Sequence, residues 1–286
     1  MQKKELWAKY IFFGFGATSV LAVVLIAVFI FAGGYPAIKE IGLFNFLFGT
    51  KWAPTNEVPQ FGILPMIVGS LYITTGAVII GVPIGILTAV YLAQFANEKV
   101  YKLLNPAVNL LAGIPSVIYG FFGMVIIVPF VRNTFGGKGY SILTASILLG
   151  IMILPTIIGV SQSAIRAVPK TYYEGAIALG ATQEQAVFKV VLPAAKSGVL
   201  AAVILGIGRS IGETMAVIMV AGGQPRITTD ILKGIRTMTS NIVMEMSYAQ
   251  DLHRSALIAT GAVLFVFILI INAGFFMLKR RMEDEH

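Results

Sequence analysis

Apolar stretches long enough to cross a membrane recur along the whole chain. A helix needs about 20 mainly apolar residues to span a bilayer. Six stretches reach that length, at 11–32, 64–93, 107–131, 142–160, 197–222 and 256–278. The pattern predicts an all-α, polytopic membrane protein with six transmembrane helices, in which residues 1–286 form a single transmembrane domain.

Three of these stretches carry further signals. The first has more apolar residues than the 7–15 of a signal-peptide core, so we expect it to remain uncleaved. Gly81, Pro83 and Gly85 interrupt the second stretch, and a neighbouring helix must then satisfy the freed carbonyl group. Pro115 predicts a kink in the third.

The composition excludes a soluble domain. The chain is 57% hydrophobic and 12% charged, with a mean hydropathy of +0.86, whereas soluble domains carry about 25% charged residues. Cysteine is absent and there are two histidines, which excludes disulfides, thiolate metal sites and a histidine-rich metal site. The net charge of +8 fits the basic edges of membrane proteins better than a nucleic-acid partner.

The basic residues predict the orientation of the helices. With the N-terminus inside, twelve Lys and Arg residues fall on the cytoplasmic side and eight outside. The Lys-Arg-Arg run at 279–281 directly follows the last apolar stretch. Cytoplasmic loops carry the excess of Lys and Arg, so both termini are expected in the cytoplasm.

Two long segments, 33–63 and 223–255, then lie outside. The first contains Trp52, which we expect at the depth of the membrane interface. Loops longer than about 15 residues are usually functional or disordered. Each segment is therefore either a solvated connector, or a docking surface or gate for an extracytoplasmic partner.

The segment 161–196, between the fourth and fifth stretches, predicts two short helices joined by a sharp turn. Pro169 suits a helix start, and Gly180 supplies the left-handed residue that ends this helix. Thr182 caps the second helix, with Gln185 three residues later as its partner. Helices this short do not span a membrane, and their mixed charges favour a groove in a partner protein over the membrane surface.

Within this segment, EGAIALGATQEQAVFKVVLP resembles the EAA loop of ABC-importer permeases in spacing, residue types and placement. The matching positions, with Gly where the motif has its first Ala, are Glu174, Gly175, Ala176, Gly180, Leu192 and Pro193. The resemblance implies the fold of type I ABC-importer permeases. It also implies a cytoplasmic coupling helix in this loop, which docks into a cleft of a separate ATPase subunit.

Three further stretches resemble the PstC-type permeases of phosphate ABC importers: KWAP at 51–54, LLAGIPSVIYGFFG at 110–123 and GIGRSIGETMAV at 206–217. This resemblance implies a transmembrane permease subunit of an ATP-driven inorganic phosphate importer that works by alternating access. The implied location is the plasma (inner) membrane of a bacterium or archaeon. The implied partners are a second permease of PstA type, a dimer of cytoplasmic ATP-binding subunits, an extracytoplasmic phosphate-binding protein and membrane lipid, but no nucleic acid.

The sequence lacks a phosphate-cradling loop for ATP. That loop has the pattern Gly-x4-Gly-Lys-Ser/Thr. Where Gly137 and Lys138 offer the Gly-Lys pair, Arg132 stands at the first Gly and Gly139 at the Ser/Thr. We therefore expect no enzymatic site, cofactor or metal in this chain, and we expect ATP with Mg²⁺ to be bound by the partner ATPase.

Arg209 and Glu213 place two charges inside the apolar stretch 197–222. They are four residues apart, which predicts a pair on one helix face. A central Arg costs about 2.5–3.5 kcal/mol to insert, so we expect the pair to face the bundle interior or a water-filled cavity. Either the pair only holds helices together, or the planar Arg209 guanidinium lines an anion path with Glu213 orienting it.

Neighbouring residues extend this candidate substrate path. Ser210 and Thr214 add hydroxyl donors, or each bonds a carbonyl group of its own helix. Gly208 and Gly212, four residues apart, predict the close approach of another helix. In the third stretch, the hydroxyl of Tyr119 is more simply interpreted as satisfied within its own helix than as part of a site.

Other classes of protein stay open. One alternative is the permease of an ABC importer for another oxyanion. A second is an ion-coupled secondary transporter, with Glu213 as its proton carrier, although such a protein has no need of an EAA loop. A membrane enzyme has no supporting constellation of His, Asp, Ser or metal ligands in the sequence.

Overall fold

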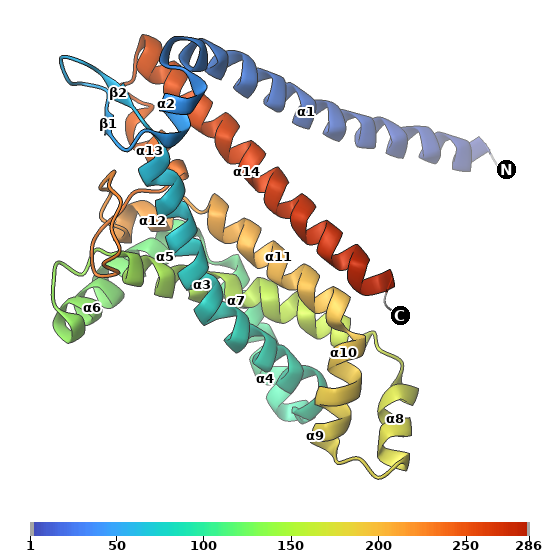
Figure 1. Cartoon of the computed structure of the whole chain (residues 1–286). Coiled ribbons are helices and arrows are strands. Elements are labelled where there is room, and N and C mark those ends of the chain that lie inside the picture. Colours follow the sequence, from blue (N-terminus) through green and yellow to red (C-terminus); the bar gives the residue numbers. More distant parts are fainter. Residues whose placement is uncertain (1–2, 285–286) are drawn as a thin grey trace.

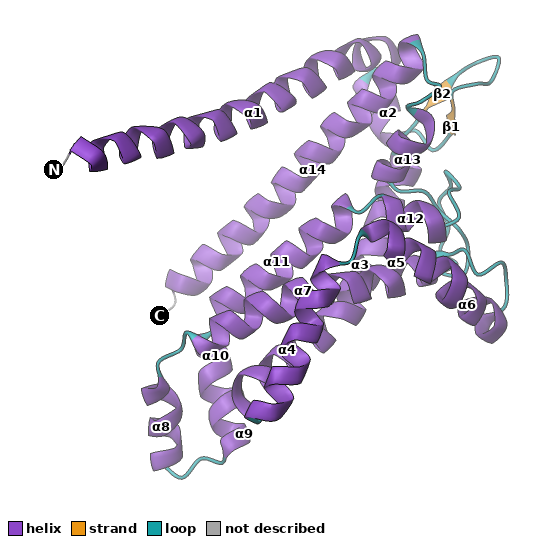
Figure 2. Cartoon of the chain, turned by 180° about the vertical axis from the view of Figure 1, so that it is seen from behind, coloured by secondary structure: helices purple, strands orange, loops and turns teal. Residues whose placement is uncertain are grey.

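The computed structural model describes residues 3–284, with side chains described for residues 7–277. The side chains of Lys3, Lys4 and the basic run at 279–281, on which the predicted orientation partly rests, lie outside that part. The regular elements of the described chain are helices, apart from one short hairpin, and loops join them (Figure 2).

The elements follow one another in the order of the figure labels (Figure 1). The helices are α1 (Lys3–Ile41), α2 (Leu43–Phe48), α3 (Leu64–Val90), α4 (Glu98–Gly113), α5 (Ser116–Phe122), α6 (Val128–Phe135), α7 (Ile142–Arg166), α8 (Lys170–Ala178), α9 (Gln183–Ala186), α10 (Leu192–Ala194), α11 (Lys196–Gly212), α12 (Met215–Val220), α13 (Met238–Glu245) and α14 (Asp251–Asp284). The π-helical turns are η1 (Tyr91–Phe95), η2 (Gly123–Ile127) and η3 (Val187–Val191), and the strands are β1 (Trp52–Ala53) and β2 (Gln60–Phe61).

The described helices match the predicted membrane protein in character, with five or six candidate spans where six are predicted. Five segments are long and apolar enough to cross a membrane: Trp7–Ile41, Leu64–Phe95, Ser116–Phe135, Ile142–Arg166 and Asp251–Met277. A sixth arises if the bent pair Gln183–Ala194 and Lys196–Gly212, which meet at 71°, forms one span. The third and fifth predicted stretches are each divided into separate helices in the structure.

The centre of the molecule is a bundle in which α3 and α7 pack along much of their lengths and α11 lies against both. α3 is one continuous helix, so the predicted interruption at Gly81, Pro83 and Gly85 is wrong. The glycines instead allow close packing on α7. A Cβ atom at Gly81 would lie 2.7 Å from the carbonyl oxygen of Gly150, and one at Gly85 would lie 2.7 Å from Ile157.

This packing predicts that Gly81→Val destabilises the protein. Overpacking a helix contact costs about 1–3 kcal/mol, and here one of the two nearest atoms is a backbone oxygen, which has no rotamer to adopt. Thermal unfolding of the purified protein in detergent measures the loss. Gly159→Ala is the control, because nothing lies within 4 Å of a Cβ atom at Gly159 on α7, and Ala favours a helix. An unchanged melting temperature for Gly81→Val contradicts the packing role.

A break at Ile114 and Pro115 divides the third predicted stretch. Proline disfavours helical geometry in the residue before it, and Ile114 is extended, with φ −71° and ψ 125°. α4 therefore ends at Gly113 as a separate helix without buried residues. Pro115 separates two helices instead of kinking one, and the membrane-crossing segment begins at Ser116, not at 107.

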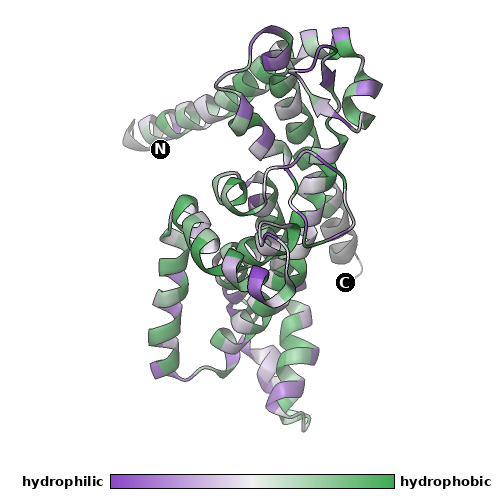
Figure 3. Ribbon diagram, turned by 90° about the vertical axis from the view of Figure 1, so that its left-hand side faces the viewer, coloured by the Kyte–Doolittle hydropathy of each residue, from purple (hydrophilic) through white to green (hydrophobic). Residues whose placement is uncertain are grey.

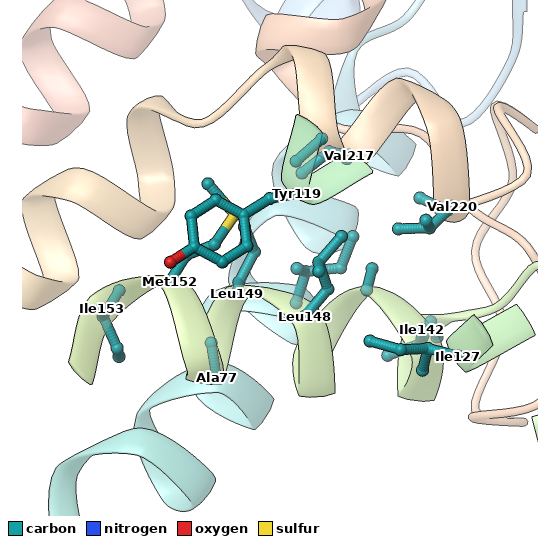
Figure 4. Close-up of a cluster of buried hydrophobic side chains, with 14 of the residues drawn as sticks. Ala77, Tyr119, Ile127, Ile142, Leu148, Leu149, Met152, Ile153, Val217 and Val220 are labelled. Atoms are coloured by element: carbon teal, nitrogen blue, oxygen red, sulfur yellow. The ribbon is translucent and has the colours of Figure 1, made fainter. Parts of the chain in front are cut away.

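A cluster of buried apolar side chains joins α5 and α12 to α7. Figure 4 shows Tyr119 of α5 and Val217 of α12 gathered over Leu148 and Met152 of α7. Burying a large apolar side chain contributes about 1.5–3 kcal/mol. The cluster thus holds two short helices, one from each divided stretch, against the same face of α7.

The long helices α1 and α14 pack on each other near the start of α14. A Cβ atom at Gly34 would lie 2.7 Å from the Cα atom of Ala259, so the two backbones nearly touch there. From that contact α1 runs away from the rest of the molecule (Figure 1). The residues of α1 are largely apolar (Figure 3). Their side chains are exposed, as in Phe12 and Phe15, which suits a helix covered by lipid or by another subunit.

The two ends of the molecule carry different structures (Figure 1). We call the end with α2, the β1–β2 hairpin and α13 the hairpin end, and the end with α8 and α9 the loop end. At the hairpin end Trp52 pairs with Phe61 across the strands, and its side chain is 6% exposed. Trp52 is therefore packed inside this end of the molecule, and its predicted depth at the membrane interface stays a prediction.

Candidate functional site at the break between α11 and α12

The fifth predicted stretch does not form one helix. α11 ends at Gly212, Glu213 is extended with φ −69° and ψ 129°, and α12 begins at Met215. α11 has 17 residues, so it spans about 26 Å at 1.5 Å per residue. The break therefore falls at the end of α11 that is remote from the loop end.

Glu213 uses its carboxylate to start α12. Its Oε1 atom accepts hydrogen bonds from the backbone N–H groups of Thr214, at 3.1 Å, and Ala216, at 3.2 Å. An anionic group at a helix start satisfies free N–H donors and favours the helix dipole. The predicted Arg209–Glu213 pair on one helix face is therefore wrong, because the helix ends before Glu213. Within the described residues no ion pair joins the two.

Arg209 lies in the last turn of α11 with an exposed side chain. The helix dipole favours a cation near the C-terminus of a helix. This interaction offsets part of the free-energy cost of placing Arg209 there. Beyond the break, α12 packs against α5, which carries Tyr119. The break thus brings together residues from two stretches that the sequence treats separately.

The hydroxyl groups of the candidate path and of Tyr119 differ in their hydrogen-bond partners. Thr214 donates its hydroxyl hydrogen to the carbonyl oxygen of Gly212 at 3.2 Å, which is the local bond that the sequence left open. Tyr119 donates to the carbonyl oxygen of Leu111 at 2.9 Å, across the break between α4 and α5. Ser210 is 3% exposed, and its hydroxyl has no hydrogen-bond partner in the described part of the chain.

The glycines of α11 divide into two groups. Gly206 faces Ile157 of α7, where a Cβ atom would lie 3.1 Å away. A Cβ atom at Gly208 or Gly212, for which the spacing predicts helix approach, would meet nothing within 4 Å among the described residues. The predicted contact is thus not made inside this chain, and an open glycine surface lies beside the exposed Arg209.

The loop end has the predicted helix-turn-helix form. Gly180 has φ +88°, and Thr182 and Gln185 form a reciprocal capping box at the start of α9. In the first turn of α9, hydrogen bonds from its own backbone N–H and from Thr182 lower the pKa of Glu184. Pro193 lies one residue before the second helix ends, at the 71° bend into α11.

One side of this loop is fixed to the bundle and the other is not. Val187 and Val191 of η3 are buried together with Val90 at the end of α3 and Ile165 of α7. α8, which carries Glu174, Gly175 and Ala176, has no buried residue. Several large apolar side chains of the loop are exposed: Tyr172, Ile177, Leu179 and Phe188.

A buried polar cluster at the hairpin end was missed by sequence reasoning. We call Trp52, Arg236, Glu245 and His253 the Glu245 cluster. The Glu245 carboxylate accepts from Trp52 Nε1 at 2.8 Å, is paired with the Arg236 guanidinium and lies 2.9 Å from His253 Nε2. Burial and the Glu245 charge raise the pKa of Tyr248 beside it. Trp52 and Glu245 are 193 positions apart, so no local spacing signals this contact.

A basic cavity of ≈ 810 Å³ opens at the hairpin end, between the α6–α7 loop and the segment that follows α12. Its charged lining residues are Lys138, Arg226, Asp230 and Lys233. Arg226 is held by a hydrogen bond from its Nε atom to the carbonyl oxygen of Gly234 at 3.0 Å. Three cations against one carboxylate give this cavity a net positive charge.

The helical bundle, the exposed loop and the broken α11 are the features to compare with known proteins. Residues 81–284 match the family model described as "Binding-protein-dependent transport system inner membrane component". The chain belongs to this family and is a multi-pass inner-membrane permease subunit of an ABC importer. Membership implies an ATPase and a substrate-binding protein as partners.

Curated relatives match most of the chain. The "Probable ABC transporter permease protein YqgH" of Bacillus subtilis is 36% identical, covering 88% of this chain and 85% of its own. The "Phosphate transport system permease protein PstC" of Mesorhizobium japonicum is 35% identical, over 92% of this chain and 88% of its own. The protein of that name from Pasteurella multocida is 33% identical, over 88% and 84%.

Solved structures of ABC-importer permeases share the fold. A chain of a bacterial alginate ABC transporter has a TM-score of 0.66 at 17% identity, over 98% of this chain and 97% of that one. A chain of the MetNI methionine transporter, in an inward-facing conformation, has a TM-score of 0.64 at 22% identity, over 77% and 95%. The predicted type I importer permease fold is confirmed.

Proposed function

We propose that the chain is the permease subunit of an ATP-driven importer of inorganic phosphate. Relatives at 33% and 35% identity, matched over most of their length, carry phosphate transport in their names. The observation that carries the proposal is the exposed Arg209 guanidinium beside an open glycine surface at a helix break. A guanidinium donates two parallel hydrogen bonds to an oxyanion, so this is a suitable place for phosphate to pass.

In this proposal Glu213 acts on the path through the backbone. Because Glu213 caps the start of α12, it fixes the residue at which α11 ends and therefore the position of Arg209. Ser210 and Thr214 complete the candidate path; the Ser210 hydroxyl is unpartnered but buried, and the Thr214 hydroxyl is bonded to Gly212. The second permease, of PstA type, covers the open surface at Gly208 and Gly212 and closes the path.

The 161–196 loop couples this path to ATP hydrolysis. The exposed face of α8 suits a cleft in the ATPase, and Gly180, Leu192 and Pro193 set the angle of the loop. Since η3 is packed against the ends of α3 and α7, a movement of the loop is passed to the bundle. This chain supplies no catalytic residue or cofactor site of its own, and the ATPase dimer binds ATP and Mg²⁺.

We propose the orientation on the basis of the same arrangement. The loop end faces the cytoplasm, where ATP is available, and the hairpin end faces the extracytoplasmic phosphate-binding protein. The N- and C-termini then lie in the cytoplasm, as the distribution of basic residues predicts. The opposite placement of the loop end and the hairpin end supports this orientation (Figure 1).

The basic cavity predicts how salt affects docking of the binding protein. Lys138→Glu combined with Lys233→Glu should slow association by about tenfold at low ionic strength, within the range that electrostatic steering gives, and by less at high salt. Association kinetics with the purified complex measure this. Lys99→Glu combined with Lys102→Glu on α4, near the loop end, is the matched control, because it makes the same change of charge. Equal association rates for the two variants contradict the docking role of the cavity.

A further inference from the structure

α13 lies between the Glu245 cluster and the break beside Arg209, and it is bonded to both. Glu245 is its last residue and the centre of the cluster. Thr239, near its first residue, donates its hydroxyl hydrogen to the backbone carbonyl oxygen of Glu213 at 3.1 Å. One helix of eight residues, about 12 Å long at 1.5 Å per residue, therefore joins the hairpin end to the break.

The outer end of α13 is fixed by three different segments. Trp52 comes from the hairpin, Arg236 from the segment before α13, and His253 from the first turn of α14. All three contact one carboxylate whose side chain is 8% exposed. A buried charge is costly unless it is paired, so movement of any of these segments is resisted through Glu245.

The inner end of α13 is seated against α3 as well as the break. The backbone N–H of Met238 donates to Ser70 Oγ of α3 at 3.1 Å. Asn241 is fully buried, and its side-chain nitrogen has no hydrogen-bond partner in the described part of the chain. A buried donor without a partner is unfavourable, so the hydrogen bonding of α13 is incomplete in its present position.

We propose that α13 is a strut through which docking at the hairpin end positions the break at Glu213, with Glu245 and Thr239 as its positioning residues. The inference rests on the proposed function, in which Arg209 lines the substrate path. Docking displaces the hairpin segments, Glu245 passes the displacement to α13, and Thr239 passes it to the Glu213 carbonyl. Neither residue touches the substrate.

Thr239→Val tests the inner end, because it keeps the shape of the side chain and removes the donor to Glu213. In proteoliposomes with the full complex, the maximal rate of phosphate uptake should fall about tenfold, in the range typical of coupling between sites. The concentration of loaded binding protein that gives half-maximal uptake should stay unchanged, and Thr239→Ser, which keeps the hydroxyl, should restore the rate. Equal rates for Val and Ser variants overturn the strut, whereas absence of uptake with the unmodified chain overturns the proposed function instead.

A labelling experiment tests the coupling without uptake. The chain has no cysteine, so Met215→Cys places a single thiol at the exposed first residue of α12. Docking of the binding protein should change the rate at which a maleimide modifies this thiol. Trp52→Phe, which keeps a ring but removes the donor to Glu245, should abolish that change while the complex still assembles. An unchanged response in the Trp52→Phe variant, or no response in the Met215→Cys parent, overturns the proposal.

Discussion

Arg209→Ala is expected to abolish phosphate uptake while leaving the complex assembled. A hydrogen bond to a charged group contributes about 1.5–3 kcal/mol, and about 1.4 kcal/mol is tenfold in binding. Loss of a two-pronged contact in the path should therefore reduce uptake about 100-fold or more. Because Arg209 is exposed and forms no ion pair with Glu213 in the described chain, its removal leaves no carboxylate buried without a partner.

Two measurements separate a role in the path from a role in holding helices. Phosphate uptake into proteoliposomes reports the path, and size-exclusion chromatography with basal ATP hydrolysis reports assembly. Arg209→Lys is the control variant, since it keeps the charge but loses the planar fork, and we expect partial activity. Loss of assembly in Arg209→Ala would show that Arg209 holds helices together. Normal uptake would show that Arg209 does not contact phosphate in the path.

Gly180→Val is expected to uncouple ATP hydrolysis from transport. Gly180 has φ +88°, where a residue with a Cβ atom costs about 1–2 kcal/mol and a β-branched one is still less favourable. Nothing in the described chain lies within 4 Å of a Cβ atom there, so the effect acts through the turn and not through a clash. α8 should then meet the ATPase at the wrong angle, and phosphate moved per ATP hydrolysed should fall about tenfold, a usual size for coupling.

The matched control is Gly180→Asn, because Asn tolerates the left-handed conformation. ATP hydrolysis and uptake are measured in the same proteoliposomes, so that the ratio of the two is independent of how much complex is reconstituted. We expect the Asn variant to keep a ratio near that of the unmodified chain. A normal ratio in the Val variant contradicts the docking role of the turn.

The loop end could be predicted in detail because its signals are local. The capping pair Thr182 and Gln185, the left-handed Gly180 and the helix start after Pro169 each depend on residues within one or two turns. The same holds for the number of apolar helices, which depends on stretch length. Local geometry and hydropathy were therefore sufficient to predict the fold class and the helix-turn-helix form of the 161–196 loop.

The break between α11 and α12 could not be predicted from the spacing of Arg209 and Glu213. Residues four apart share a helix face only if the helix continues, and Glu213 ends it by capping the next helix with its own carboxylate. Apolar content alone gave no sign of this, since α11 and α12 are both apolar. The Glu245 cluster lay out of reach for another reason: Trp52 and His253 meet Glu245 only through tertiary packing.

The central claim is that this chain imports phosphate by using the energy of ATP hydrolysed by a partner. The most direct measurement reconstitutes it with the second permease, the ATPase and the binding protein in proteoliposomes, and follows radiolabelled phosphate. We expect uptake that needs both ATP and the loaded binding protein, that persists without an ion gradient, and that excess sulfate does not inhibit. Uptake driven by a proton gradient without ATP, or equal uptake of sulfate, would contradict it.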